Sequence, residues 1–260
     1  MNPDEIRALY DEHERIHLIE SDTRREAADG VVRYVNQLSP RSFVLHMAVP
    51  DAMVDATIEQ QIAYFESIGH DFEWKVFSYD QPADLSERLA RRGFELDEVE
   101  TIMALDLSQL PEALARPVTH DVRRITAPEQ VRGILAIQRE VFEDDDDSFI
   151  VKYLETTLRE YPNEISLYAA YVDGQPVSAS WLRMPTHSPF ASLWGGATLA
   201  PYRGRGLYTA LVAVRAQEAK ARGYQFLTID ASDMSRPICE KQGFVKLCTA
   251  IACEWKCQNS

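Results

Sequence analysis

Long apolar stretches and dispersed cysteines are both missing from this 260-residue chain. No run approaches the roughly 18 apolar residues that a membrane-spanning helix needs, and the charged start MNPDEIRALYDEHERI lacks the apolar core of a secretory signal. The cysteines all fall near the end of the chain, at Cys239, Cys248, Cys253 and Cys257. A disulfide framework spreads its cysteines along the sequence, and this spacing matches no common zinc pattern. We therefore expect a cytoplasmic protein with reduced cysteines, no metal and no membrane partner.

Positive charge is also scarce. The chain has 27 Lys and Arg against 41 Asp and Glu, a formal net charge of −14, and no basic stripe. Nucleic acid is therefore not an expected partner, because neutralising phosphates requires clustered Lys and Arg. A negative field favours the approach of a cationic substrate. Hydrophobic residues at 45% and charged residues at 26% are typical of an ordinary globular protein.

Apolar periodicity predicts two successive sets of helices and strands. In the first set, helices are expected at 4–19, 55–68 and 84–92, and strands at 30–38, 43–49, 72–79 and 96–107. In the second set, helices are expected at 128–142, 149–159, 207–222 and 237–242, and strands at 122–125, 166–172, 177–183, 191–199, 226–231 and 244–255. Asp173-Gly174 is a hairpin signal. Prolines break the pattern at 111–119, so we predict domains at 1–116 and 117–260.

The two sets resemble each other near their ends. FEWKVFSYDQPADLSERLARRGFELDEVETIMALDL reads as strand, turn, helix, Gly-Phe and strand, and so does YQFLTIDASDMSRPICEKQGFVKLCTAIACEWKC. Gly93-Phe94 and Gly243-Phe244 occupy the same place in that order, where the helix stops. The shared order suggests two copies of one α/β unit, although any strand-helix-strand unit can end its helix with glycine.

A glycine-rich turn carries the strongest chemical signal. SLWGGATLAPYRGRGLYTALVAVRAQEAKARGY leads from an expected strand through Arg203-Gly204-Arg205-Gly206 into a long helix. Glycines at such a turn let backbone N–H groups converge on an anion, and the helix N-terminus adds its dipole. The stretch lacks the Gly-Lys-Ser/Thr of a nucleotide-hydrolysing P-loop, and Thr209 stands where the dinucleotide fingerprint has its third glycine. The pattern predicts a loop that binds pyrophosphate.

This segment resembles the pyrophosphate motif of the GNAT superfamily of acyl-CoA-dependent N-acyltransferases, Arg/Gln-x-x-Gly-x-Gly/Ala. Arg203 and Gly206 match the motif, whereas Tyr208 replaces its small last residue. The family's late-helix segment, Tyr-Glu-Lys-x-Gly-Phe, is similar to Cys239-Glu240-Lys241-Gln242-Gly243-Phe244. The resemblance covers about 118–255 and implies an α/β fold with a mixed sheet, as two GNAT-like lobes. The first lobe lacks the loop, so we interpret it as a degenerate GNAT-like domain without a cofactor.

The resemblance also implies which residues hold acetyl-CoA, the expected cosubstrate. They belong to the strand before the loop, the loop, the first helical turn and a later turn: Ala197, Thr198, Leu199, Arg203, Gly204, Arg205, Gly206, Leu207, Tyr208 and Ser232. In the family a tyrosine of the late helix protonates the leaving thiolate. Cys239 stands there in this chain, either as a candidate acid or as a small buried residue. Tyr208 is a second candidate for the proton donor.

The acceptor side is implied more loosely. In the family the region between the first two helices of the domain lines the acceptor site, and here it carries the acidic run 143–147 with Asp144 and Asp145. These two carboxylates, Trp194 and Asp230 are candidate contacts of an amine substrate. A solvated charge run, a packing tryptophan and a helix-capping aspartate are equally simple interpretations.

The leading hypothesis is an N-acetyltransferase that transfers an acetyl group from acetyl-CoA to a primary amine of a small molecule, as a monomer or a homodimer. Three alternatives stay open: a non-catalytic acyl-CoA-binding or regulatory module, a protein-lysine acetyltransferase, and a structural two-lobe protein with a vestigial loop. The missing tyrosine favours the binding module. Both arginines and both glycines of the loop argue against a vestigial one.

Overall fold

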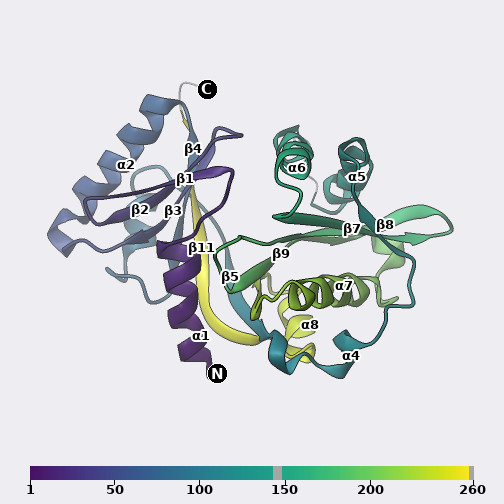
Figure 1. The fold of residues 1–260 in the computed structure, drawn as a ribbon. Coiled ribbons are helices and arrows are strands. Elements are labelled where there is room, and N and C mark those ends of the chain that lie inside the picture. The colour runs from purple at the N-terminus through teal and green to yellow at the C-terminus, as the bar shows by residue number, and fades with distance from the viewer. Residues whose placement is uncertain (143–147, 258–260) are drawn as a thin grey trace. The chain divides into compact units, whose positions relative to one another are not determined.

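The computed structural model describes residues 1–142 and 148–257, and the chain divides into two compact units. Unit 1 comprises Met1–Ile102, Ala231–Arg236 and Lys246–Ser260, and unit 2 comprises Met103–Asp230 and Pro237–Val245. Each unit combines helices with strands in a mixed α/β fold (Figure 1). Within the described residues, none of the helices is both long and apolar enough to cross a membrane.

Unit 1 is built on neighbouring strands in the order β1 (Thr23–Ala28), β2 (Val31–Asn36), β3 (Arg41–Met47), β4 (Asp71–Phe77) and β11 (Val245–Trp255). β3 and β4 run parallel, and the other neighbours are antiparallel. The remaining elements are α1 (Pro3–Tyr10), η1 (Asp11–Ile16), η2 (Asp51–Met53), α2 (Val54–Ile68), α3 (Leu85–Ala90) and the start of β5 (Glu95–Asp106). Asn2 and Glu5 form a capping box at the start of α1, which confirms the predicted helix start.

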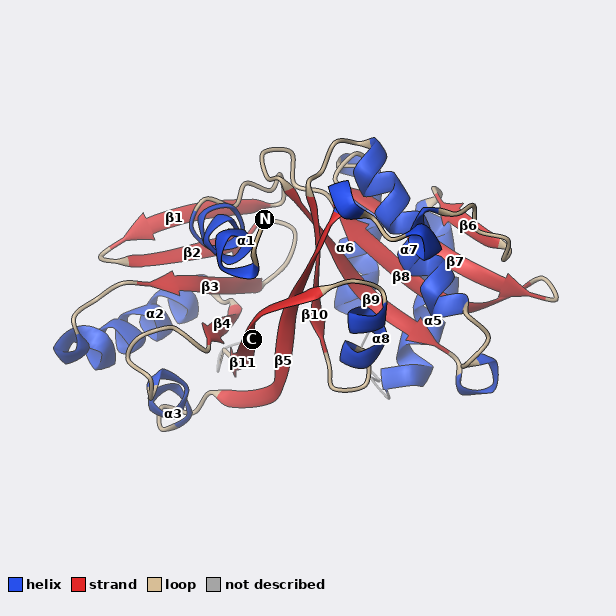
Figure 2. Ribbon diagram, turned by 90° about the horizontal axis from the view of Figure 1, so that it is seen from below, coloured by secondary structure: helices blue, strands red, loops and turns tan. Residues whose placement is uncertain are grey.

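Helices α1 and α2 cover opposite faces of these strands (Figure 2). Val31 and Val35 of β2 share an apolar cluster with Phe65 of α2. The alternate residue Tyr34 points to the other face, where its hydroxyl donates to Arg15 O in η1. The period-2 alternation of β2 therefore serves two layers at once, which explains why this strand is apolar nearly throughout.

Unit 2 contains neighbouring strands in the order β10 (Phe226–Ala231), β9 (Phe190–Thr198), β8 (Gln175–Arg183), β7 (Ile165–Val172) and β6 (Val122–Ile125). β9 and β10 run parallel, and the other neighbours are antiparallel. The helices are α4 (Glu112–Ala115), α5 (Val131–Phe142), α6 (Ser148–Glu160), α7 (Leu207–Ala221) and α8 (Arg236–Lys241). Asp173 and Gly174 both have positive φ angles in the β7–β8 turn, which confirms the predicted hairpin.

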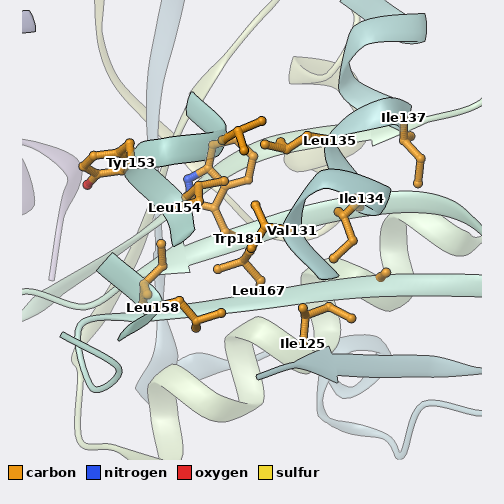
Figure 3. Packing of buried hydrophobic residues seen from close by; sticks show 14 of the residues in the cluster. Ile125, Val131, Ile134, Leu135, Ile137, Tyr153, Leu154, Leu158, Leu167 and Trp181 are labelled. Atoms are coloured by element: carbon orange, nitrogen blue, oxygen red, sulfur yellow. The ribbon is translucent and has the colours of Figure 1, made fainter. Parts of the chain in front are cut away.

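The strands of unit 2 are covered on both faces, by α5 and α6 on one and by α7 on the other (Figures 1 and 2). The α5 and α6 layer packs apolar side chains such as Leu135 and Leu154 over Trp181 of β8 (Figure 3). Ala169 of β7 belongs to this cluster, while its neighbour Ala170 packs with α7 on the opposite face. The two-sided burial follows from strands that read as almost continuous apolar runs.

The repeated Gly-Phe pattern ends α3 and α8 in the same way. Gly93 and Gly243 have φ angles of +94° and +90°, a conformation that favours glycine after a helix. Phe94 N and Phe244 N each donate to the backbone carbonyl five residues earlier, and both side chains are buried. This shared geometry supports two copies of one α/β unit.

The compact units do not coincide with the predicted domains 1–116 and 117–260. Residues 250–255 of β11 pair with 72–77 of β4 and so lie in unit 1. The segment before residue 117 lies in unit 2 from Met103 onward, where Gln217 of α7 donates to Leu114 O and Arg116 O. β5 and β11 therefore each begin in one unit and end in the other. The predicted limits concern independently folding domains and stay a prediction.

Most expected elements are confirmed within a few residues, and three features of the N-terminal and linking segments differ. The sequence does not predict β1, because TRREAA is a polar edge strand with no fully buried residue. It does not predict the short α4 either. The expected helix over 4–19 changes after Tyr10 into the π-helix η1, where Arg15 turns inward to Asp80 at 2.7 Å. That contact joins residues far apart in sequence, so periodicity cannot reveal it.

Leu154→Ala tests the packing of α6. Leu154 is fully buried, so the variant should lower the free energy of unfolding by about 2–5 kcal/mol. Urea denaturation followed by circular dichroism measures the loss. Lys152→Ala, exposed on the same helix, is the control and should change stability by less than about 0.5 kcal/mol. Equal losses in the two variants would contradict the burial of Leu154.

Candidate functional site

The hydrogen-bonded ladder between β9 and β10 stops partway along both strands. Its register runs from Phe226 and Phe190 to Ile229 and Leu193, and then ends although both strands continue. From Trp194 onward the backbone of β9 is therefore no longer paired with β10. A strand edge of this kind can bond an extended ligand through its backbone groups.

A β-bulge marks the same part of β9. Here one residue of β8, Ser180, is opposed by two of β9, Gly195 and Gly196. Gly195 has a φ angle of +59°, and a Cβ atom on it would lie 1.9 Å from the ring of Trp181. Gln138 of α5 donates a side-chain hydrogen bond to Gly195 O. The bulge is thus held from the α5 and α6 face, at a position that only glycine fits.

Loop 203–206 presents backbone N–H groups at the start of α7. Gly204 and Gly206 have φ angles of +74° and +79°, in the left-handed region that favours glycine. Gly206 is the N-cap residue, and no side chain caps the helix. The first N–H groups of α7 therefore have no intrahelical partner, and such groups fit a phosphate.

Two arginines of this loop and a neighbouring histidine contact backbone carbonyls. Arg203 Nε donates to Thr198 O at 3.0 Å, and Arg205 Nη2 donates to Pro201 O at 3.2 Å. Behind the loop, His120 Nε2 lies 3.1 Å from Arg205 O. Both arginines are exposed, so their charges are accessible to an anion.

The segment of β9 between the bulge and the loop is held by β8. Ser178 Oγ donates to Ala197 O at 2.8 Å and lies 2.7 Å from the Thr198 hydroxyl. Leu199 N donates to Val177 O at 3.0 Å, so this N–H group already has an acceptor. The three residues 197–199 thus lie in one ordered segment directly before the loop. Their role in cofactor binding stays a prediction.

Tyr208 extends from the first turn of α7 towards α8. Its hydroxyl lies 3.9 Å from Cys239 Sγ, and its ring lies 2.9 Å from a Cβ atom placed on Gly196. Cys239 is fully buried, whereas Tyr208 is half-buried. Burial raises the pKa of the Tyr208 hydroxyl and that of the Cys239 thiol above their ordinary values. The two candidate proton donors therefore lie together beside the bulge.

Two of the expected acceptor residues also lie at the end of the ladder. Trp194 on β9 and Asp230 on β10 each follow the last paired residue of their strand. The Trp194 side chain is exposed, and its Nε1 donates to Ser192 Oγ at 2.8 Å. An aromatic face and a carboxylate thus occupy neighbouring positions where the strands stop pairing.

Three other expected residues stay predictions. Asp144 and Asp145 lie outside the described residues. Ser232 belongs to the segment Ala231–Arg236 of unit 1, where its hydroxyl lies 3.3 Å from that of Ser235.

Sequence analysis missed three polar side chains of the site: His120, Gln138 and Arg215. Arg215 is buried on α7, two turns after Tyr208, and donates to Trp181 O at 3.0 Å. No motif identifies these side chains, because the role of each depends on which distant backbone group it meets. The one usable signal is that Arg215 directly follows the small and apolar stretch TALVAV.

A bulged strand edge that leads into a helix N-terminus with unpaired N–H groups has a geometry suited to an extended, phosphorylated ligand. Comparison with family models identifies the chemistry: residues 131–244 match the Acetyltransferase (GNAT) family. These residues therefore form a GNAT acetyltransferase domain, and the protein is an acyltransferase. Comparison with curated proteins gives no match.

Solved structures share this fold over most of the chain. A GCN5-related N-acetyltransferase from Kribbella flavida has a TM-score of 0.68 at 16% identity, covering 97% of this chain and 95% of that chain. A tandem GNAT protein from the clavulanic acid biosynthesis pathway has a TM-score of 0.60 at 13% identity, covering 100% and 89%. A GCN5-related N-acetyltransferase from Sphaerobacter thermophilus has a TM-score of 0.59 at 14% identity, covering 89% and 82%. At these identities the likeness establishes the predicted mixed α/β GNAT fold.

Gly195→Ala tests the close approach at the bulge. Gly195 and Gly174 both have positive φ angles, but a Cβ atom at 195 meets Trp181 whereas nothing lies within 4 Å of one at 174. Gly174→Ala should therefore lower stability by about 1–2 kcal/mol, the penalty of a left-handed backbone. Gly195→Ala should lower it by about 1–3 kcal/mol more, because the indole ring must move. Urea titrations compare the two, and equal losses would contradict the contact.

Proposed function

We propose that the protein transfers an acetyl group from acetyl-CoA to a primary amine of a small molecule. The family establishes the acyltransferase class, and the donor and acceptor belong to the proposal. The observation that carries it is the continuity of the bulged strand β9 with loop 203–206 and the N-terminus of α7. One ligand can contact a strand edge and a phosphate-binding helix at once there. Coenzyme A has the two matching parts, an amide-containing arm and a pyrophosphate.

The residues that would hold the cosubstrate follow in chain order. Residues 197–199 are placed to contact the arm. The pyrophosphate falls to the loop and the first turn of α7: Arg203, Gly204, Arg205, Gly206, Leu207 and Tyr208. The two exposed arginines supply positive charge to this site in a chain whose net charge is −14. Ser232 completes the proposed set.

A cationic acceptor suits the charge of the protein. The net charge of −14 attracts an ammonium group from a distance. Trp194 and Asp230 offer an aromatic face and a carboxylate at neighbouring positions of β9 and β10, and both are favourable partners of a cation. Asp144 and Asp145 remain proposed acceptor residues.

Tyr208 is the proposed proton donor. As the amine nitrogen bonds to the thioester carbonyl carbon, the C–S bond breaks and its electron pair leaves with the sulfur. Tyr208 gives its hydroxyl proton to that sulfur, and the proton lost by the amine returns through solvent to Tyr208. Tyr208 is half-buried with its ring beside Gly196, whereas Cys239 is fully buried. The raised pKa of Tyr208 keeps the hydroxyl protonated at neutral pH.

The state of the cysteines supports the proposed cytoplasmic location. All four are buried, and none of them forms a disulfide. Free thiols are usual in a reducing compartment.

Acetyl-CoA binding is tested by the melting temperature. At about 100 times its dissociation constant, acetyl-CoA should stabilise the wild type by about 2.7 kcal/mol. Arg203→Ala and Gly206→Glu should lose most of that gain, because one removes a charge and the other places a carboxylate in the loop. Gly223→Glu is the matched control at the far end of α7, with a φ angle of +89° and nothing within 4 Å of its Cβ. This control should keep the shift. A folded wild type without any shift would contradict the proposed donor.

Turnover separates the enzyme from a binding module. The release of CoA thiol is measured with a panel of small primary amines and with a lysine-containing peptide. Faster acetylation of a small amine supports the proposal, and a preference for the peptide would instead support a protein-lysine acetyltransferase. Binding of acetyl-CoA without turnover of any acceptor would support a non-catalytic module.

Tyr208→Phe tests the proton donor. The variant keeps the ring and removes the proton, so kcat should fall by about 10²-fold or more while KM for acetyl-CoA changes little. Cys239→Ala should leave kcat close to that of the wild type. Steady-state kinetics, with melting temperatures as a check on folding, measures both. The reverse ranking would make Cys239 the donor.

A further inference from the structure

Arg215 carries a positive charge in the interior of unit 2. It lies on α7 with 1% of its surface exposed. Its Nε donates to Leu211 O at 2.9 Å, and its Nη1 donates to Trp181 O at 3.0 Å. Both acceptors are backbone carbonyls, and no described carboxylate forms an ion pair with it. Such a cation is costly to bury, because it gives up water without gaining an opposite charge.

A second buried arginine shows how a buried positive charge is usually neutralised, by carboxylate partners. Arg15 of unit 1 has 2% of its surface exposed and pairs with Asp11 at 2.9 Å and Asp80 at 2.7 Å. Although burial lowers the pKa of Arg15, these partners raise it above its ordinary value. For Arg215, burial lowers the pKa to about 10. Both side chains are nearly inaccessible to solvent, and Arg15 has two carboxylate partners where Arg215 has backbone carbonyls.

The titratable groups that interact electrostatically with Arg215 are acids that are neutral at ordinary pH. They are Tyr208 of α7, Cys239 of α8 and Tyr168 of β7. Arg215 lowers the pKa of Tyr208 and that of Cys239, against the larger effect of burial on each. Among the described groups acting on Tyr208, it is the one cation. Carboxylates act further out, with Glu240 raising the pKa of Cys239 and Glu218 that of Tyr168.

We propose that Arg215 is a positioning residue for acetyl transfer, whose buried charge enables the Tyr208 hydroxyl to give up its proton to the departing sulfur. The inference rests on the proposed function. An ordinary phenol, with a pKa of about 10, is a weaker acid than a thiol at about 8.5, so this transfer leaves an unstable phenolate. Arg215 is placed to stabilise that phenolate until a proton from the amine, relayed by solvent, restores Tyr208.

Two variants separate the charge of Arg215 from its hydrogen bonds. Arg215→Gln keeps an N–H donor and removes the charge. It should lower kcat by up to about tenfold for each unit by which the pKa of Tyr208 rises, with KM for acetyl-CoA unchanged. Arg215→Lys keeps the charge and should restore most of kcat. Combined with Tyr208→Phe, Arg215→Gln should have no further effect on kcat, because the two residues act through one proton.

A measurement that does not need turnover accompanies the kinetics. With 3,5-difluorotyrosine incorporated at position 208, the phenol ionises in an accessible pH range and is followed by ¹⁹F NMR. Arg215→Gln should raise the pKa of this phenol by about one unit, because a phenolate loses its nearby cation. Arg215→Lys should leave the titration close to that of the protein with native Arg215.

The outcomes separate this inference from the proposed function. A structural role alone would shift the melting temperature, leave the fluorine titration unmoved and lower kcat equally with and without Tyr208→Phe, and that result overturns the inference. If the wild type binds acetyl-CoA without turnover, the proposed function fails by itself. In that case a shifted titration would support the coupling between Arg215 and Tyr208 but contradict its role in acetyl transfer. An unmoved titration would contradict both the coupling and the role.

Discussion

The close approach of the Trp181 ring to the backbone of Gly195 is the constraint on which the site depends. The ring occupies the space that a side chain at 195 would need, so the bulge requires glycine at this position. The bulge at Gly195 and Gly196 begins two residues beyond Leu193, the last β9 residue that pairs with β10. A strand that is regular up to that point thus becomes a free edge just before it reaches the loop at α7.

The same irregularity explains the buried polar side chains around it. A bulge removes regular ladder bonds, and buried carbonyl groups then need other donors. Three side chains from three elements supply hydrogen bonds here, from Gln138 of α5 to Gly195 O, from Arg215 of α7 to Trp181 O and from Ser178 of β8 to Ala197 O. Arg215 differs from the other two because it also brings a charge. The same residue therefore links the support of the bulge with the electrostatics of Tyr208.

Unit 1 has the same helix end as unit 2 but no glycine loop like that at 203–206. It keeps the Gly-Phe helix end at Gly93-Phe94 and the strand that follows. Its buried arginine, Arg15, is neutralised by two carboxylates, as expected of a structural ion pair. A duplicated unit in which only one copy binds a cosubstrate would keep the helix end in both copies and the glycine loop in one. The helix end is kept because it depends on local backbone geometry alone.

The sequence by itself determined the features that are local in the chain. Alternation and 3.6-residue periodicity located most helices and strands. Gly204 and Gly206 indicated a turn into a helix, because few other residues adopt their φ angles. Tertiary structure alone decided that β11 pairs with β4, that Gln138 meets Gly195 O and that Arg215 donates to Trp181 O. Each of these contacts joins segments that packing brings together. The sequence around a polar residue does not reveal which distant group it will contact.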